Sequence, residues 1–282
     1  MNRIRSCFIT IVIIIFLSSL VFLCVALPGN QNGSALGIFS PARNYLFLGV
    51  DDRDGAEFKG RTDTMLVLHV AGFGRKDSLI SIPRDIRVHL EGQGYQKINA
   101  AYVFGGKEMA ENEVYDLTGI RVHRTMVINF EGFKRIIDIL GGVTIEVTEP
   151  MHDPLSGANF DPGVYHMDGE QALAFSRSRA TARADLDRVE RQQELLTELI
   201  RQKVGLSAIT RLPRVLAVLE EETLSNLTML DYASLGFFML FSFRGMNRLT
   251  IPTEGANIDG ISYLIADPDQ TREYLSMYME ID

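Results

Sequence analysis

The sequence predicts a layered α/β/α domain with a mostly antiparallel or mixed central sheet flanked by helices, preceded by one N-terminal transmembrane helix. Three observations support this prediction. Residues 7–27 form one uncharged apolar run, and after residue 43 short β-rich runs alternate with helical patterns. Apolar residues make up 46% of the chain and there are only 9 prolines, which is enough material for a sizeable core. Strands that alternate with helices are typical of a sheet covered by helices.

The apolar run has the length of a membrane span. Its 21 residues, Cys7 to Leu27, would extend roughly 30 Å as a helix. Arg3 and Arg5 precede it and residues 28–42 carry no charge, so the positive-inside rule places residues 1–6 in the cytoplasm. The alternative is a cleaved secretory signal, but the apolar core is too long and Val25-Ala26-Leu27 is a poor cleavage site. We expect an uncleaved single-pass signal anchor in the cell membrane, and both interpretations export the rest of the chain.

The exported part is predicted to be one domain on a tether. Residues 28–42 are rich in Gly, Asn and Ser and are interpreted as a flexible tether, and residues 43–282 contain no linker-like break. Both cysteines lie in the anchor, so the exported domain has neither a disulfide nor a thiol nucleophile. When Arg3 and Arg5 are excluded, the chain has 26 basic and 36 acidic residues, which gives a net charge of about −10. We therefore expect no nucleic-acid partner, and a polyanionic ligand would need a local basic cleft.

The secondary structure follows from periodicity and turn signals. Apolar runs bounded by Gly, Asp or Pro predict strands over 45–50, 64–70, 78–83, 123–129, 142–148 and 248–252. Helical spacing predicts helices over 99–117, 130–140, 185–204, 209–222 and 231–241, with two more that start near residue 168 and residue 268. Residues 151–165 are rich in Asp, Pro, Gly and Asn, and this composition predicts a loop.

Carboxylates lie at the predicted strand ends. Asp51 and Asp52 follow the first strand, and Asp63 directly precedes the second. Side chains at strand ends meet at one rim of a sheet, where two or three carboxylates would suit Mg²⁺. The structural alternative is that these residues form turns or cap helices, as Asp beside Gly commonly does.

Arginines are concentrated in one part of this acidic chain. Arg84 ends the third strand, and five more follow the predicted short helix: Arg177, Arg179, Arg183, Arg188 and Arg191. In an extended segment Arg177 and Arg179 would point the same way. Several guanidinium groups together would clamp a pyrophosphate, because each presents a rigid bidentate fork. Alternatively, they pair with Asp185, Asp187 and Glu190 on a solvated helix face.

Other catalytic signatures are absent from the sequence. The five histidines show no metal-ligand spacing, and there is no GxSxG elbow, P-loop or HExxH motif. The remaining candidates for chemistry are the carboxylates, which could bind a metal, and the arginines. Together they are suited to neutralising charge on a phosphoryl group during transfer.

Eight motifs in a fixed order carry a family resemblance. They are GVDDR at 49–53, GRTDTM at 60–65, SIPRD at 81–85, KINAAY at 97–102, INFEGF at 128–133, DILGGV at 138–143, DGEQALAFSRSR at 168–179 and DRVERQQ at 187–193. Together they resemble the LytR–CpsA–Psr family of bacterial cell-envelope proteins. The resemblance implies a membrane-anchored, extracytoplasmic, Mg²⁺-dependent phosphotransferase. Such an enzyme moves a glycopolymer from a polyprenyl-pyrophosphate carrier onto peptidoglycan and forms a phosphodiester bond.

The resemblance also implies roles for individual residues. Asp51 and Asp63 match metal-binding aspartates, and Arg84, Arg177, Arg179 and Arg188 match arginines that contact the pyrophosphate. Arg53 lies beside the first motif and is included among the substrate-binding residues. Asp185 keeps an acidic position and is the candidate general base, although Asp187 stands where the family has glycine, which leaves the identity of the base open.

Two further questions stay open at this level. The resemblance implies a long apolar cavity for the lipid, but we interpret the apolar residues near the second half of the sheet as plain core: Val127, Ile136, Ile137, Leu140, Leu195 and Leu199. The alternative functions are a polyprenyl-pyrophosphate pyrophosphatase, or a non-catalytic lipid-linked glycan binder or scaffold. The older label of transcriptional attenuator agrees poorly with an exported acidic domain. The sequence does not identify the glycopolymer.

Overall fold

A computed structural model describes most of the chain after residue 42. The described residues are 43–51, 58–71, 76–180, 185–203, 210–228, 230–232, 234–236 and 245–279. The predicted anchor and tether lie outside them, and none of the described helices is long and apolar enough to cross a membrane. With the exception of Ala71, the described residues belong to one compact unit that comprises Arg43–Val70 and Lys76–Asp282.

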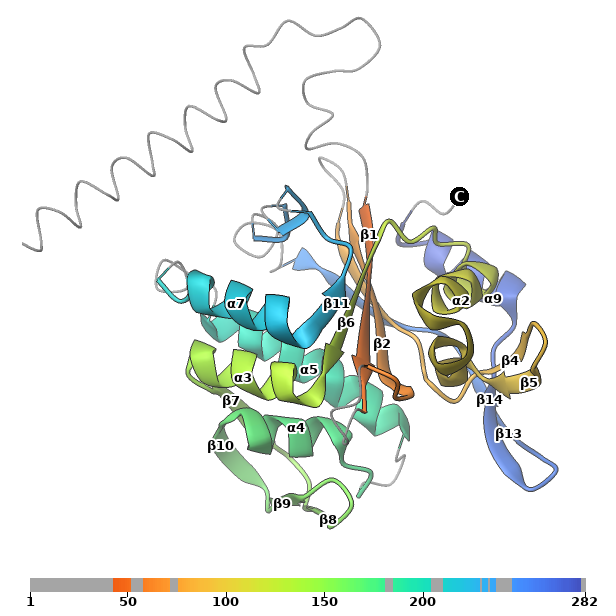
Figure 1. Cartoon of the computed structure of the whole chain (residues 1–282). Coiled ribbons are helices and arrows are strands. Elements are labelled where there is room, and N and C mark those ends of the chain that lie inside the picture. Colours follow the sequence, from red (N-terminus) through yellow and green to blue (C-terminus); the bar gives the residue numbers. More distant parts are fainter. Residues whose placement is uncertain are drawn as a thin grey trace, which may run out of the picture. The chain divides into compact units, whose positions relative to one another are not determined.

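A six-stranded mixed sheet forms the centre of this unit (Figure 1). Its order is β11-β6-β1-β2-β3-β12. The strands are β1 (Arg43–Val50), β2 (Thr62–Val70), β3 (Ser78–Ser81), β6 (Arg124–Asn129), β11 (Thr223–Ser225) and β12 (Asn247–Thr250). β1 is antiparallel to β2 and parallel to β6, and β3 is parallel to β12. The prediction of a mixed sheet is confirmed.

Helices cover both faces of the sheet (Figure 1). The short 3-10 helix η2 (Ile98–Ala100) leads into α2 (Ala101–Thr118), which lies on one face together with α9 (Pro268–Ser276). The other face carries α3 (Phe130–Leu140), α5 (Asp185–Lys203) and α7 (Leu212–Glu222), and α4 (Gly169–Arg177) packs beside α3. The predicted α/β/α layering is therefore confirmed.

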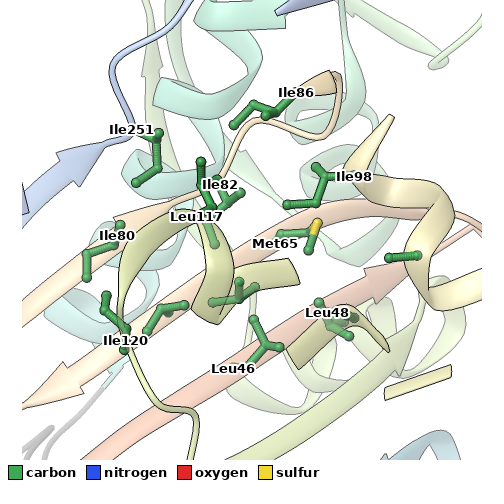
Figure 2. Packing of buried hydrophobic residues seen from close by; sticks show 14 of the residues in the cluster. Leu46, Leu48, Met65, Ile80, Ile82, Ile86, Ile98, Leu117, Ile120 and Ile251 are labelled. Atoms are coloured by element: carbon green, nitrogen blue, oxygen red, sulfur yellow. The ribbon is translucent and has the colours of Figure 1, made fainter. Parts of the chain in front are cut away.

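Strand alternation divides the apolar side chains between the two faces. Leu46 and Leu48 of β1 and Met65 of β2 are buried in a dense cluster on the α2 side, with Ile80 of β3 beside them (Figure 2). Phe47 of β1 has the opposite orientation, because successive side chains of a strand point to opposite faces. That second face is only partly filled by core residues, and a cavity lies against it.

Short hairpins were the main error of the secondary-structure prediction. Residues 151–165 contain β8 (Met151–Asp153) and β9 (Ala158–Phe160), which pair with each other, and the start of β10 (Gly163–Met167), which pairs with β7 (Val143–Val147). The loop prediction was wrong because strands of three residues are too short to show periodicity. The sequence also gave no sign of the hairpin of β4 (Arg87–Leu90) with β5 (Gly94–Lys97), or of the hairpin of β13 (Glu254–Ile258) with β14 (Ile261–Ile265).

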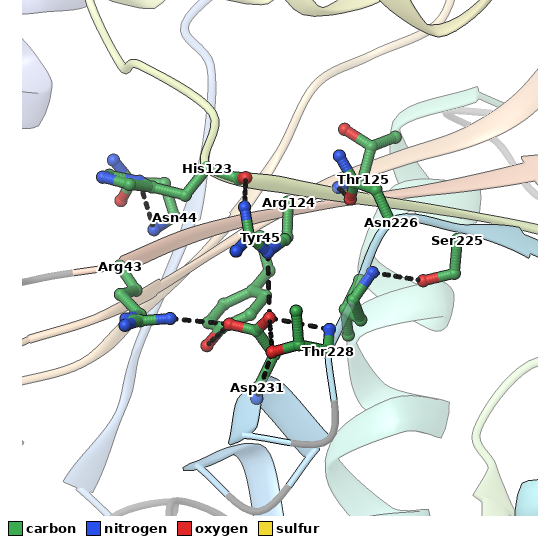
Figure 3. A network of polar contacts seen from close by, with 11 residues as sticks. Arg43, Asn44, Tyr45, His123, Arg124, Thr125, Ser225, Asn226, Thr228 and Asp231 are labelled. Atoms are coloured by element: carbon green, nitrogen blue, oxygen red, sulfur yellow. Dashed lines mark hydrogen bonds and ion pairs between the residues drawn. The ribbon is translucent and has the colours of Figure 1, made fainter. Parts of the chain in front are cut away.

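A buried carboxylate ties the segment after β11 to the sheet (Figure 3). The fully buried side chain of Asp231 accepts a hydrogen bond from Arg43 at 2.7 Å and one from Arg124 at 2.9 Å. The backbone N–H of Thr228 donates to the same carboxylate at 2.8 Å. Burial opposes ionisation, but the hydrogen bonds from Thr228 and the charge of Arg124 hold the pKa of Asp231 below its ordinary value. This network connects the starts of β1 and β6. In the predicted helix 231–241, the described residues 231, 232 and 234–236 are helical.

Candidate active site

The cavity between the sheet and the helices α3, α5 and α7 has a volume of about 770 Å³. One part of its wall is charged and much of the rest is apolar. The charged part contains Asp51, Arg61, Asp63, Arg84, Asp85, Lys97, Arg177, Arg179 and Arg188. Six of the eight residues assigned from the sequence therefore lie in one site: Asp51, Asp63, Arg84, Arg177, Arg179 and Arg188. Arg53 lies outside the described residues, and so does the side chain of Asp185, the first residue of α5.

A register shift in the sheet places Asp63 in the cavity beside Asp51. Gly49 pairs with Thr64, but the next residue of β1, Val50, pairs with Thr62, so Asp63 is an extra residue between them. Strict alternation would turn Asp63 toward the face of Met65, on the α2 side. Because a bulge re-aims the extra side chain, Asp63 lines the cavity together with Asp51. The sequence predicted that these residues meet at a sheet rim, but it gave no sign of the bulge.

A chain of opposite charges runs along one side of the cavity. Arg84 bonds to Asp63 through Nη1, and its Nε lies 3.4 Å from Asp85 Oδ2. Lys97 Nζ donates to the other oxygen of Asp85 at 2.6 Å. Burial of Asp85 opposes ionisation, but the hydrogen bond from Lys97 and the charge of Arg84 outweigh it and lower the pKa of Asp85. Asp85 is consequently ionised at neutral pH and holds both cations in place.

The end of α4 supplies cations from the opposite side. A capping box of Asp168 and Gln171 starts this helix, and Ser178 leaves helical geometry after Arg177. The prediction of an extended segment was therefore wrong for Arg177, which is helical because the capped helix continues to it. The chain turns at Ser178, and both Arg177 and Arg179 still line the cavity.

Contacts on both sides position this helix end. The Arg177 guanidinium lies 4.5 Å from the ring centre of Phe130, and its Nη2 lies 3.7 Å from Asp51 Oδ2. The backbone N–H of Arg179 donates to Asp153 Oδ2 at 2.8 Å. The Arg177 guanidinium thus lies against an aromatic face and near a carboxylate, and it lines the cavity.

The arginines of α5 have different roles. Arg188 is only 4% exposed and lines the charged part of the cavity. Arg191, one turn further along, does not line this cavity and bonds through Nη2 to the carbonyl oxygen of Ser178. It therefore stabilises the turn that follows α4, and Arg183 lies outside the described residues.

Two residues of the charged part and one neighbouring amide were missed at the level of the sequence. Arg61, Lys97 and Asn99 line the cavity but had no assigned role. Asn99 is 3% exposed, and its Oδ1 is buried with no hydrogen-bond partner among the described residues. The KINAAY motif was the available signal, because it puts Lys97 and Asn99 two residues apart at the start of a helix.

Much of the remaining cavity wall is apolar. It is formed by side chains of the sheet and of three helices: Phe47, Leu66, Leu68, Leu79, Met126, Ile128, Phe133, Ile136, Leu195, Leu196, Leu199, Ile200, Leu219 and Met246. The interpretation as plain core was correct for Val127 and Ile137, which are fully buried in core clusters. It was incomplete for Ile136, Leu195 and Leu199, because one apolar helix face can pack on core at one edge and border a cavity at the other.

The oxygen ligands suit a hard cation. Among the described residues, no group of three or more His, Cys, Asp and Glu side chains is placed to hold a metal. Mg²⁺, however, is typically bound through one or two carboxylates with water and substrate phosphate completing the shell. Asp51 and Asp63 are two carboxylates in one site, and no described residue hydrogen-bonds to the Asn99 Oδ1. This set of ligands fits Mg²⁺.

Comparison with known proteins defines the family. A sequence profile described as the LytR_cpsA_psr family matches residues 39–278, and the chain belongs to this family. TagU of Oceanobacillus iheyensis, named polyisoprenyl-teichoic acid–peptidoglycan teichoic acid transferase, is 34% identical over 236 residues, which are 81% of this chain and 72% of that relative. LcpB of Corynebacterium glutamicum, named a probable cell wall biosynthesis protein, is 37% identical over 188 residues, 62% of this chain and 44% of that relative.

A solved structure has the same fold. The crystal structure of protein gbs0355 from Streptococcus agalactiae superimposes with a TM-score of 0.75 at 25% sequence identity. The superposition covers 84% of this chain and 86% of that one. This chain and gbs0355 therefore share the mixed α/β fold.

Proposed function

We propose that this protein is a membrane-anchored, extracytoplasmic phosphotransferase that moves a glycopolymer from a polyprenyl-pyrophosphate carrier onto peptidoglycan. The observation that carries the proposal is a single cavity with a charged part rich in arginine and an apolar part enclosed by the sheet and three helices. A polyprenyl pyrophosphate likewise has a charged end and an apolar chain. The name of the relative TagU, which specifies a polyisoprenyl-linked donor and peptidoglycan as acceptor, supports this assignment.

Donor binding follows from the wall of the cavity. The polyprenyl chain lies against Phe47, Leu196 and Leu199, because removing its apolar surface from water is favourable. Arg177 and Arg179 approach the pyrophosphate from the end of α4 and the segment after it, and Arg84 approaches it from the turn that follows β3. Guanidinium groups on two sides bind the two phosphates bidentately and fix the direction of the bond that breaks.

The reaction is attack on the phosphorus distal to the lipid. A hydroxyl group of the acceptor glycan adds to that phosphorus, and polyprenyl phosphate leaves toward the apolar part. Arg84, Arg177 and Arg188 neutralise the charge that develops on the phosphoryl oxygens and on the leaving phosphate. Asp51, Asp63 and Asn99 would hold Mg²⁺, which when bound supplies further positive charge to the phosphoryl oxygens. Asp185 is the proposed base that takes the hydroxyl proton.

The proposed location follows from the N-terminal sequence. Residues 7–27 would cross the membrane once with the N-terminus in the cytoplasm, and residues 28–42 would link this span to the domain outside. This arrangement places the cavity in the compartment that contains peptidoglycan. We propose no particular glycopolymer, because the names of the matching relatives give different roles.

The test uses a donor with a radiolabelled oligosaccharide, Mg²⁺ and peptidoglycan fragments, with and without EDTA. We expect label on peptidoglycan, and we expect EDTA or Arg179→Ala to abolish it. Release of the labelled glycan without transfer would instead indicate a pyrophosphatase. Tight donor binding without any turnover, with several acceptors, would indicate a carrier or scaffold.

A further inference from the structure

The hairpin β4–β5 directs one face away from the core, next to the charged part of the cavity. Its register pairs Arg87 with Lys97 and His89 with Tyr95, so these four side chains share one face. Leu90, on the other face, is fully buried in the core cluster. The shared face is therefore fixed in orientation by the packing beneath it.

Cations and aromatic rings alternate along this face. The Arg87 guanidinium lies 3.7 Å from the ring centre of Tyr95 and 5.8 Å from that of Tyr263 in β14. Lys97 Nζ lies 5.9 Å from the Tyr263 ring, and the His89 ring packs edge-on against Tyr95 at 5.1 Å. We call the row Lys97, Tyr263, Arg87, Tyr95 and His89 the aromatic ladder. Its inner end, Lys97, lines the cavity and bonds to Asp85.

The outer end of the aromatic ladder is accessible and prearranged. Tyr95 is 57% exposed although the Arg87 guanidinium stacks on its ring. The Arg87 Nε is buried and has no hydrogen-bond partner among the described residues, so stacking contacts hold this side chain in place. A pyranose ring suits such a surface, because its C–H groups pack on the aromatic face while its hydroxyl groups reach neighbouring donors.

We propose that the aromatic ladder binds the acceptor glycan, with one sugar ring stacked on Tyr95. The inference rests on the proposed phosphotransferase function. In phosphoryl transfer the attacking and leaving oxygens lie roughly in line, on opposite sides of the phosphorus. Because the leaving lipid phosphate faces the apolar part, the acceptor approaches from outside the charged part. The aromatic ladder extends from the charged part toward that side, and Lys97 belongs both to the ladder and to the charged part.

The test compares Tyr95→Ala with the wild type, both as full chains in detergent. Donor and acceptor are titrated separately, the acceptor being a tetrasaccharide of alternating N-acetylglucosamine and N-acetylmuramic acid. We expect the KM for the tetrasaccharide to rise about tenfold while the KM for the donor is unchanged. Tyr95→Phe keeps the ring and should behave as wild type. Tyr115→Ala, which removes a 40% exposed tyrosine from α2, is the matched control and should change neither value.

A binding measurement separates this inference from the proposed function. Saturation-transfer NMR without any donor should show the tetrasaccharide on the wild type and lose it in Tyr95→Ala. An unchanged acceptor KM, or unchanged NMR binding, would overturn the inference even if transfer is demonstrated. A rise in the donor KM alone would also overturn it, because the aromatic ladder would then hold the donor's glycan. If the wild type transfers nothing, the proposed function fails and the NMR result alone decides the inference.

Discussion

Arg177 Nη2 lies 3.7 Å from Asp51 Oδ2, so the end of a helix in the outer layer meets the end of a strand in the central sheet through opposite charges. Asp63 and Arg84 make a second such pair, and Asp85 and Lys97 make a third. Each of these three cations already has a carboxylate partner in the absence of substrate. Phosphate would therefore enter a site in which the positive charges are positioned beforehand, which is the arrangement that favours electrostatic catalysis.

Removal of Arg177 should lower transfer strongly. Arg177→Ala deletes the guanidinium between Phe130 and Asp51, and we expect the transfer rate to fall about 100-fold. Arg177→Lys keeps the charge but loses the planar fork, so we expect only partial activity. The measurement is label transfer at saturating donor. Arg214→Ala, which removes an exposed arginine from α7, is the control. Full transfer and donor binding in Arg177→Ala would refute the assignment.

Asp63 should govern the requirement for Mg²⁺. In Asp63→Asn one carboxylate is lost from the proposed metal site, and we expect the Mg²⁺ concentration for half-maximal transfer to rise at least about tenfold. Asp259→Asn changes an exposed aspartate in the β13–β14 turn and should leave the Mg²⁺ dependence unaltered. If Asp63→Asn has the wild-type Mg²⁺ dependence, the metal site lies elsewhere.

The sequence predicted the larger elements because their patterns are local. α3 was predicted with its observed bounds, Phe130–Leu140, and a helix was predicted to start near residue 168, where Asp168 caps α4. Short hairpins were missed because strands of three to five residues, such as β8 and β5, are stabilised by packing and turns that periodicity does not report.

The site was predicted in part for a related reason. Residues at strand ends, such as Asp51 and Arg84, converge because the sheet brings its ends together. For Lys97 and Asn99 the KINAAY motif was the available signal, but their roles depend on where the β4–β5 hairpin folds. The cavity could not be predicted from periodicity, because the spacing of Leu199 is the same whether its side chain packs in the core or lines a cavity.

The apolar part of the cavity should determine lipid affinity. Leu199 lines this part, and Leu199→Trp would fill space that we propose for the polyprenyl chain. We expect the affinity for a long-chain donor to fall at least about tenfold, while a water-soluble short-chain analogue binds as before. Leu212→Trp, at a half-exposed position on α7, controls for the added indole. Equal loss of both donors would indicate a general structural effect, and no loss would exclude this cavity as the lipid site.

The Asp231 network should matter for stability. Asp231→Asn leaves Arg43 and Arg124 without their buried carboxylate (Figure 3), and we expect the free energy of unfolding to fall by about 3 kcal/mol in urea denaturation. Because the folded-state pKa of Asp231 is lowered, this stabilisation is present above the unfolded pKa of 3.8 and is lost as pH falls through the folded value. The difference between variant and wild type should therefore shrink in acid. A difference that is constant with pH would contradict the account.

The most direct test of the central claim follows each phosphate of the donor separately. Two donors are prepared, one with ³²P in the phosphate next to the sugar and one with ³²P in the phosphate next to the lipid. The full chain in vesicles is then given peptidoglycan and Mg²⁺. We predict that the sugar-proximal label becomes covalently attached to peptidoglycan and that the lipid-proximal label stays with the polyprenyl chain. Transfer of both labels, or of neither, would contradict attack at the phosphorus distal to the lipid.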